Sequence, residues 1–148
     1  MNQQENSRPL KFRLFRITTD QFAVLPDVFN KNKKNINISI GLKFGLDSQR
    51  RIIASFVKVE FEQNQRVFIV LEVGHHYEIE IKSFDELNKI ENKIIIPKDM
   101  AMHLVSLTIG TLRGVLHCKT ENTEFEDLIL PTINITELIK GDVELDIK

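Results

Sequence analysis

The sequence predicts an α+β domain in which a four-stranded antiparallel sheet packs on one long helix. Apolar and polar residues alternate without error over 36–46 and alternate again, less regularly, over 53–61 and 67–81, which predicts three long strands with one face on a core. Short polar segments separate these strands and favour an antiparallel meander. Residues 100–116 are apolar in almost every direction around a helix, which predicts a helix buried on more than one side.

The length and the composition fit one folded domain. The chain has 148 residues, of which 42% are hydrophobic and 28% charged, so we expect a flexible lead-in over 1–9 and a single domain over 10–148. Twenty basic and twenty-one acidic side chains give a net charge of -1, without the cationic excess of a protein that coats nucleic acid or adsorbs to membranes. The polar N-terminus lacks the apolar segment of a secretory signal, and no apolar run reaches the roughly 18–20 residues that span a bilayer. We therefore expect a cytoplasmic protein.

The remaining elements follow from local patterns. Residues 10–18 alternate until Phe15 and predict a short, twisted strand that pairs along one edge of the meander. Residues 20–35 contain Pro26 and a polar run of Asn and Lys, which predicts a long crossing loop; such loops are often functional. Ser83, with Glu86 three residues later, predicts the N-cap of a short helix. An extended apolar tail over 128–138 leads to a last helical turn near 136–140.

The predicted long helix needs cover on two sides. One sheet covers one side, and Gly110 and Gly114 allow another backbone to approach the other closely. We expect a second copy of the chain at this surface, with Gly110 or Gly114 near the contact between helices. The alternative is that the C-terminal segment folds back over the helix.

The polar residues do not form a catalytic constellation. His75 and His76 are neighbours in a strand and point to opposite faces, while His103 and His117 lie about 21 Å apart along one helix. The glycines form no phosphate-binding loop, and the single cysteine, Cys118, allows no internal disulfide. We expect no enzyme activity, no cofactor and no metal. The carboxylates of two neighbouring strands are expected to form a solvated acidic sheet face: Glu60, Glu62, Glu72, Glu78 and Glu80.

Apolar residues exceed what one small core requires. Phe22 and Phe29 lie in the predicted loop, and Phe68 and Val70 lie on the predicted solvent face of the sheet. A contiguous apolar lining on a surface indicates a binding site for another molecule. The alternative is an interface between subunits.

Three segments together resemble the SecB family of export chaperones, over about residues 12–138. Residues 16–29 (RITTDQFAVLPDVF) resemble the family's first strand and crossover loop, and residues 71–79 resemble its third strand and the stretch after it. Residues 95–138, from Ile-Ile-Pro through the long helix to LPTINITEL, resemble its ending. The resemblance implies a Greek-key crossover, pairing of subunits through sheet edges, and helices sandwiched in a homotetramer that is a dimer of dimers.

The resemblance also implies a function. Such proteins hold unfolded or nascent polypeptides in apolar grooves without ATP, and an acidic sheet face binds the export motor SecA. Asp20 and Glu72 fall where acidic residues of that face would lie. The expected peptide-binding residues follow the crossover and the C-terminal segment: Phe22, Val24, Phe29, Tyr77, Leu128 and Leu130.

The sequence departs from the family in ways that affect these expectations. The Lys33-Lys34 neighbourhood replaces an aromatic residue near the end of the crossover, and Pro131-Thr132 replaces a double proline. The sequence also ends soon after Lys140, without the polar tail that helps SecA engagement. Peptide holding is therefore better supported than export coupling. The alternatives are a SecB-like chaperone of a toxin–antitoxin system and a non-catalytic adaptor that binds one folded partner.

Overall fold

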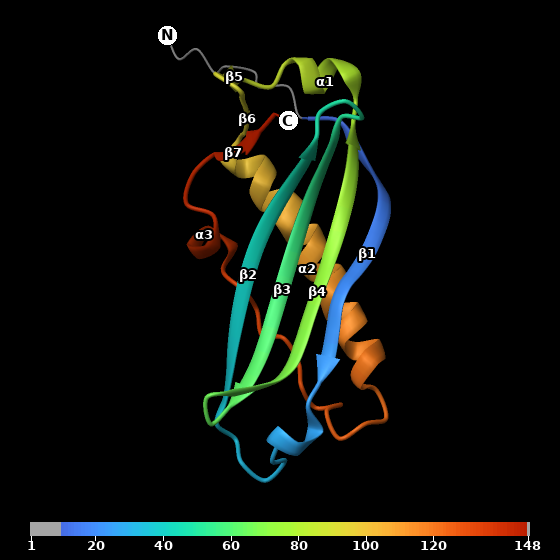
Figure 1. Ribbon diagram of the computed structural model, residues 1–148, viewed down its shortest axis with the longest axis vertical. Helices are drawn as coiled ribbons and strands as arrows, with labels where there is room; N and C mark the ends of the chain where they lie inside the picture. Colours follow the sequence, from blue (N-terminus) through green and yellow to red (C-terminus); the bar gives the residue numbers. More distant parts are fainter. Residues whose placement is uncertain (1–9, 148) are drawn as a thin grey trace.

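A four-stranded antiparallel sheet forms one layer of the molecule, and the long helix α2 crosses one of its faces (Figure 1). The structure is a computed structural model that describes residues 10–147; the predicted lead-in over 1–9 lies outside them. The fold is therefore α+β, as predicted. The sheet is formed by β1 (Phe12–Val24), β2 (Ile36–Asp47), β3 (Ile52–Gln63) and β4 (Arg66–Ile79), in the order β1-β4-β3-β2.

Strands β2, β3 and β4 form the predicted meander. Each pairs antiparallel with the next, and β1 lies beside β4 after a crossover from the far edge, which is Greek-key connectivity. The β3–β4 turn is the two-residue pair Asn64-Gln65, whose φ angles of 54° and 64° are left-handed. Such a turn matches the twist of the strands that it joins, and it sets the register of the hairpin.

Strand β1 is longer than predicted. The prediction of a strand ending near residue 18 was wrong, because the register with β4 shifts between Leu14 and Arg16 and again between Thr19 and Gln21. Each shift is a β-bulge, which adds one unpaired residue and reverses the alternation without ending the strand. The crossover is therefore shorter than predicted, running over 25–35 with a short helical turn, η1 (Pro26–Val28).

The helices differ from the prediction at their ends. Helix α1 (Ile81–Asp85) begins before Ser83, which is not its N-cap; the Ser83 hydroxyl instead accepts a hydrogen bond from the Lys11 N–H at 3.0 Å. Helix α2 (Lys98–Thr120) extends beyond the predicted 100–116 at both ends. The last turn is α3 (Ile135–Leu138). A small second sheet, which the sequence did not predict, has the order β5 (Lys89–Ile90), β6 (Lys93–Ile96) and β7 (Val143–Asp146).

The core lies between the sheet and α2, and a buried polar network crosses it. The Tyr77 hydroxyl donates to the Leu104 carbonyl at 3.0 Å, and His75 Nδ1 lies 2.8 Å from the same hydroxyl. His75 Nε2 lies 2.6 Å from the Thr111 hydroxyl. Burial, followed by the neighbouring His76, lowers the pKa of His75 and favours its neutral ring. These directional bonds fix the position of α2 on the sheet.

Candidate functional site

Exposed apolar side chains gather on β1 and at the start of the crossover. Leu14, Phe15 and Ile17 are 42%, 44% and 52% exposed, and Leu25 is 55% exposed. Leu14 and Ile17 lie opposite the inward positions Tyr77 and His75, whereas the Phe15 ring contacts His76 on the outer face, so these residues share one edge of the sheet and not one face. None of these four residues was among those that the sequence predicted to bind peptides. The adjacent apolar residues Leu14 and Phe15 could have indicated this exposure. The β-bulge at Phe15 keeps both residues in one strand and leaves both exposed.

The structure places the six predicted peptide-binding residues in two environments. Phe22, Val24, Phe29 and Leu128 are half-buried and reach the surface. Tyr77 is 0% exposed and Leu130 is 1% exposed, so both are core residues in this protomer, contrary to the expected lining. Tyr77 occupies an inward position of β4, and the Leu130 segment is held down by Arg113, whose guanidinium donates to the carbonyls of Leu130 and Pro131.

Four half-buried residues of β1 and the crossover pack against the core and lie close in sequence to the exposed Leu25; together we call them the crossover patch: Phe22, Val24, Leu25, Val28 and Phe29. Phe29 stacks on Phe68 with ring centroids 4.8 Å apart, and it contacts Phe125 at 5.0 Å. Phe68 is only 1% exposed, so its predicted place on the solvent face was wrong. A register shift between Phe61 and Glu62 in the β3–β4 ladder turns it inward, where it supports the patch from below.

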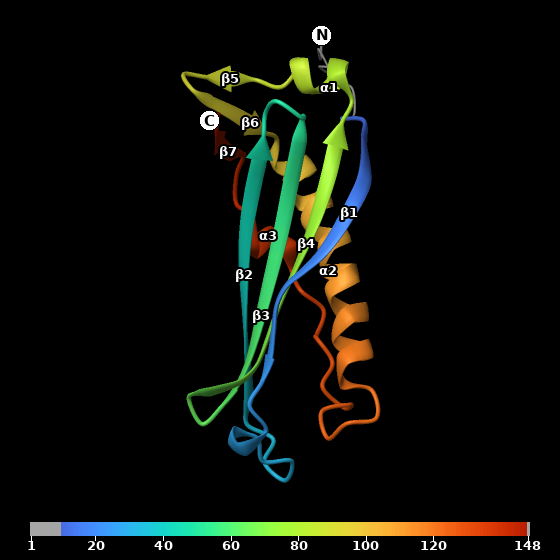
Figure 2. The same ribbon diagram turned by 45° about the vertical axis from the view of Figure 1, so that its right-hand side comes forward.

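The crossover continues into residues 30–35, which we call the lysine loop because it carries Lys31, Lys33 and Lys34. The side chain of Gln63, 1% exposed at the end of β3, holds this loop. Gln63 Oε1 accepts from the Asn30 N–H at 2.7 Å, and Gln63 Nε2 donates to the carbonyls of Asn30 and Lys33 at 3.0 and 3.2 Å. The loop lies next to the β3–β4 turn at one end of the sheet (Figures 1 and 2).

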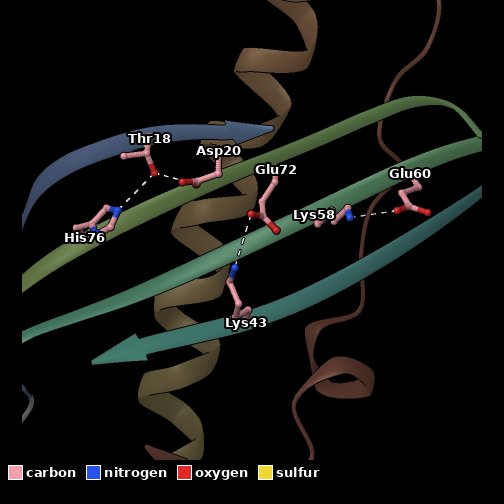
Figure 3. Close-up of polar contacts among 7 residues, drawn as sticks. All are labelled: Thr18, Asp20, Lys43, Lys58, Glu60, Glu72 and His76. Carbon is pink, nitrogen blue, oxygen red and sulfur yellow. Dashed lines mark hydrogen bonds and ion pairs between the residues drawn. The ribbon is translucent and has the colours of Figure 1, made fainter. Parts of the chain in front are cut away.

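The sheet face away from α2 carries Asp20 and Glu72 among residues of both charges (Figure 3). Asp20 is exposed and accepts from the Thr18 hydroxyl at 2.9 Å. Glu72 lies 3.8 Å from Lys43, and Glu60 lies 3.4 Å from Lys58. This face is therefore mixed in charge and differs from the acidic face that the sequence predicted.

His76 belongs to the same outer face. Its Nε2 lies 3.4 Å from the Thr18 hydroxyl, and its ring meets the edge of Phe56 at 5.6 Å. Burial lowers the pKa of His76, and Arg16 lowers it further, whereas Asp20 opposes the shift. His75 is 2% exposed on the opposite side, so the two neighbouring histidines face apart, as predicted.

One face of α2 is not covered by the protomer. We call it the outer helix face: His103, Ser106, Leu107, Gly110, Gly114 and His117, all exposed. A Cβ atom at Gly110 or Gly114 would have no heavy atom within 4 Å, apart from its own helix backbone and chain neighbours. The C-terminal segment folds back beside α2, as one alternative predicted, but it leaves this face open. No Lys, Arg, Asp or Glu occurs from Met100 to Leu112.

Within residues 10–147 no helix is long and apolar enough to cross a membrane. The same residues contain no group of three His, Cys, Asp or Glu side chains placed to hold a metal ion.

The fold and the surface together define an α+β protein that presents an apolar crossover beside an exposed edge strand. No family model and no curated protein sequence matches the chain. Among solved structures, the chain is similar to the SecB-like chaperone Rv1957 of Mycobacterium tuberculosis, in complex with a ChAD peptide from the HigA1 antitoxin. The identity is 13%, the TM-score 0.45, and the match covers 85% of this chain and 87% of that one. It is also similar to a protein of unknown function from Streptococcus agalactiae, at 12% identity, a TM-score of 0.41, and 85% and 98% coverage.

Proposed function

We propose that this chain is an ATP-independent holdase chaperone of the cytoplasm, which binds unfolded or nascent polypeptides and performs no catalysis. The observation that carries the proposal is the concentration of exposed apolar residues on β1 and the crossover patch. An unfolded chain offers apolar segments that a folded partner hides. Phe22, Val24, Phe29 and Leu128 are the proposed contacts, joined by Leu25; Tyr77 and Leu130 are buried in the core and are not among them.

Magnitudes favour a holder that binds several segments at once. A seven-residue client segment that buries roughly 400 Å² of apolar surface gains about 10 kcal/mol at ~25 cal/mol/Å². Ordering its backbone costs about 7–14 kcal/mol. One segment therefore binds weakly, and useful affinity requires several sites on one assembly, where the first contact raises the effective concentration of the next.

A homotetramer built as a dimer of dimers would supply those sites. The proposal rests on the outer helix face, which lacks charge and is open at Gly110 and Gly114. Gly110→Leu should not disturb the protomer, because its Cβ has free space and leucine favours a helix by about 1 kcal/mol over glycine. Analytical ultracentrifugation should nevertheless show a smaller assembly, since overpacking between helices costs about 1–3 kcal/mol. A parent protein that is monomeric at micromolar concentration would contradict the assembly.

The main test is suppression of aggregation with two unrelated unfolded clients. The parent should suppress both. Leu25→Ser should reduce suppression, because it removes an apolar side chain that is 55% exposed in the patch. Ile90→Ser is the matched control, since Ile90 is 60% exposed but lies in β5, far along the chain from the crossover. Equal loss in both variants would show that the patch is not the client surface.

Export through SecA is the finer form of the proposal. Asp20 and Glu72 share the outer sheet face, where reversing them to lysine should weaken a motor contact and leave client binding intact. The effect should be larger at low salt, where charges are less screened. If the unmutated chain does not bind SecA at low salt, export coupling is wrong. A general holdase or a chaperone of an antitoxin then remains, and binding of one folded partner with no unfolded client supports an adaptor.

A further inference from the structure

The lysine loop carries cationic charge that the protomer does not neutralise. Lys31, Lys33 and Lys34 are exposed, and Arg66 is exposed at the start of β4, on the adjacent turn. None of these four side chains makes an ion pair with a carboxylate within residues 10–147. In a chain with a net charge of -1, this is a local concentration of one sign.

The outer sheet face shows the contrasting arrangement. Lys43 lies 3.8 Å from Glu72, and Lys58 lies 3.4 Å from Glu60, so the lysines of that face have carboxylate partners. The charge of the lysine loop is instead available to another molecule. An exposed cationic cluster attracts acidic partners and lowers its affinity for basic ones.

The lysine loop is held in position. The buried Gln63 amide bonds the backbone at Asn30 and Lys33 in three places, and the Asn35 side chain donates to the Asn64 side chain at 2.8 Å. The Asn32 N–H also donates to the Asn30 side chain at 3.0 Å. Because the backbone is fixed, the three lysines present their charge at a defined place and their binding loses less entropy.

The same connection carries the apolar contacts. Phe29 ends the crossover patch and is followed directly by the lysine loop, and Leu25 lies five residues before Asn30. An extended client advances about 3.3 Å per residue. Residues that flank an apolar segment on the patch therefore come within reach of the lysines after a few positions.

We propose that the lysine loop selects client segments in which aspartate or glutamate flanks an apolar run. The inference rests on the proposed holdase function and names the class of polypeptide that it prefers. The occupant is an unfolded chain with acidic flanks, because only this partner uses the apolar patch and the adjacent unpaired cations together. Each exposed ion pair changes affinity about twofold, so three together give a preference of about tenfold over a neutral segment.

The test uses three labelled peptides with one apolar core, flanked by Asp and Glu, by Asn and Gln, or by Lys. Fluorescence anisotropy with the full chain at low salt should rank them acidic, neutral and basic, with about tenfold between the first two. The preference should disappear near 1 M salt, where the Debye length is about 3 Å. Lys31→Ala/Lys33→Ala/Lys34→Ala should bind the acidic and neutral peptides equally. The control Lys82→Ala/Lys89→Ala/Lys140→Ala has the same net charge and should keep the preference, because its exposed lysines lie outside the loop.

Each of the other outcomes contradicts the inference about the lysine loop, the holdase proposal, or both. If the neutral peptide binds and the acidic peptide binds no better, the inference is wrong and the holdase proposal stands. If none of the peptides and no unfolded client binds, both are wrong. If the loop variant lowers the mass of the assembly and the control does not, the loop is a contact between copies and the inference is wrong. The salt dependence of the unmutated protein decides the question even if the triple variant fails to fold.

Discussion

The Gln63 side chain is a direct point at which to test how the crossover is held. Gln63→Met keeps the length and approximate volume of the side chain but removes its two donors and its acceptor. The Asn30 N–H then loses the acceptor 2.7 Å away, and the carbonyls of Asn30 and Lys33 lose donors. The strand that carries Gln63 keeps its ladder with β4, so the change acts on the crossover.

The expected cost follows from the number of bonds and their exposure. A hydrogen bond contributes about 0.5–1.5 kcal/mol net, so three give about 1.5–4.5 kcal/mol. Asn30 and Lys33 are exposed, and water replaces part of what is lost, which places the cost at about 2 kcal/mol. For a chain of this size the midpoint of thermal unfolding should fall by about 4–8 °C.

Amide hydrogen exchange provides the local readout. Protection of the Asn30 amide should fall by about thirtyfold, as 2 kcal/mol requires, while amides in the middle of β3 change in proportion to global stability only. The control is Gln21→Met at an exposed position of β1, which should leave the Asn30 amide protected. Unchanged exchange at Asn30 in the Gln63 variant would refute the reasoning, because the loop would then be held by other contacts.

Two further predictions concern the sheet. Gly74→Ala should destabilise the fold by about 1–3 kcal/mol, because its Cβ would lie 2.7 Å from the Phe56 ring and from the Thr18 hydroxyl. In urea titrations Gly45→Ala, whose Cβ would meet Phe56 at an ordinary 3.6 Å, should show no such loss, and equal losses would contradict this account. The second prediction is that stability falls as the pH drops below about 6.5, the ordinary pKa of histidine. The folded-state pKa of His75 is lowered, so the unfolded chain takes up the proton first and stability is complete only above that pH. His75→Gln should flatten the dependence of the urea midpoint between pH 7.5 and 5.5 more than His76→Gln, since His76 is less buried; identical slopes in parent and variant would disprove the role of His75.

The sequence predicted the fold where local patterns dominate. Strand β2 alternates without interruption, so its bounds were predicted closely. The predicted first strand was too short, because two bulges in β1 reverse the alternation. These bulges depend on pairing with β4, which lies about 50 residues later in the chain. The small sheet of β5, β6 and β7 was missed for a related reason: its strands have two to four residues, and β7 pairs with a segment far from it in sequence.

The site was predicted in part, and the errors have the same origin. Phe22, Val24 and Leu128 do reach the surface, whereas Tyr77 lies inside. Alternation had already placed Tyr77 on the same face as the core residues of β4, but the resemblance to a family suggested an exposed role. The hydrogen bonds by which Gln63 holds the lysine loop could not be predicted from the sequence. They join residues about 30 positions apart through a buried side-chain amide.

The order of the strands has a consequence for the chain during its own synthesis. β1 is made first, yet its partner is β4: Phe12 pairs with Ile79, and the partner strand is complete only about 55 residues after Val24. At ~5–20 residues per second, β1 waits about 3–11 s beside the ribosome without a ladder. During that interval Leu14, Phe15 and Ile17 are as accessible as the segments that we propose the mature protein binds. A completed copy with the proposed holdase activity would therefore cover the nascent edge strand of the next, and the yield of folded chain should then rise when finished protein is already present.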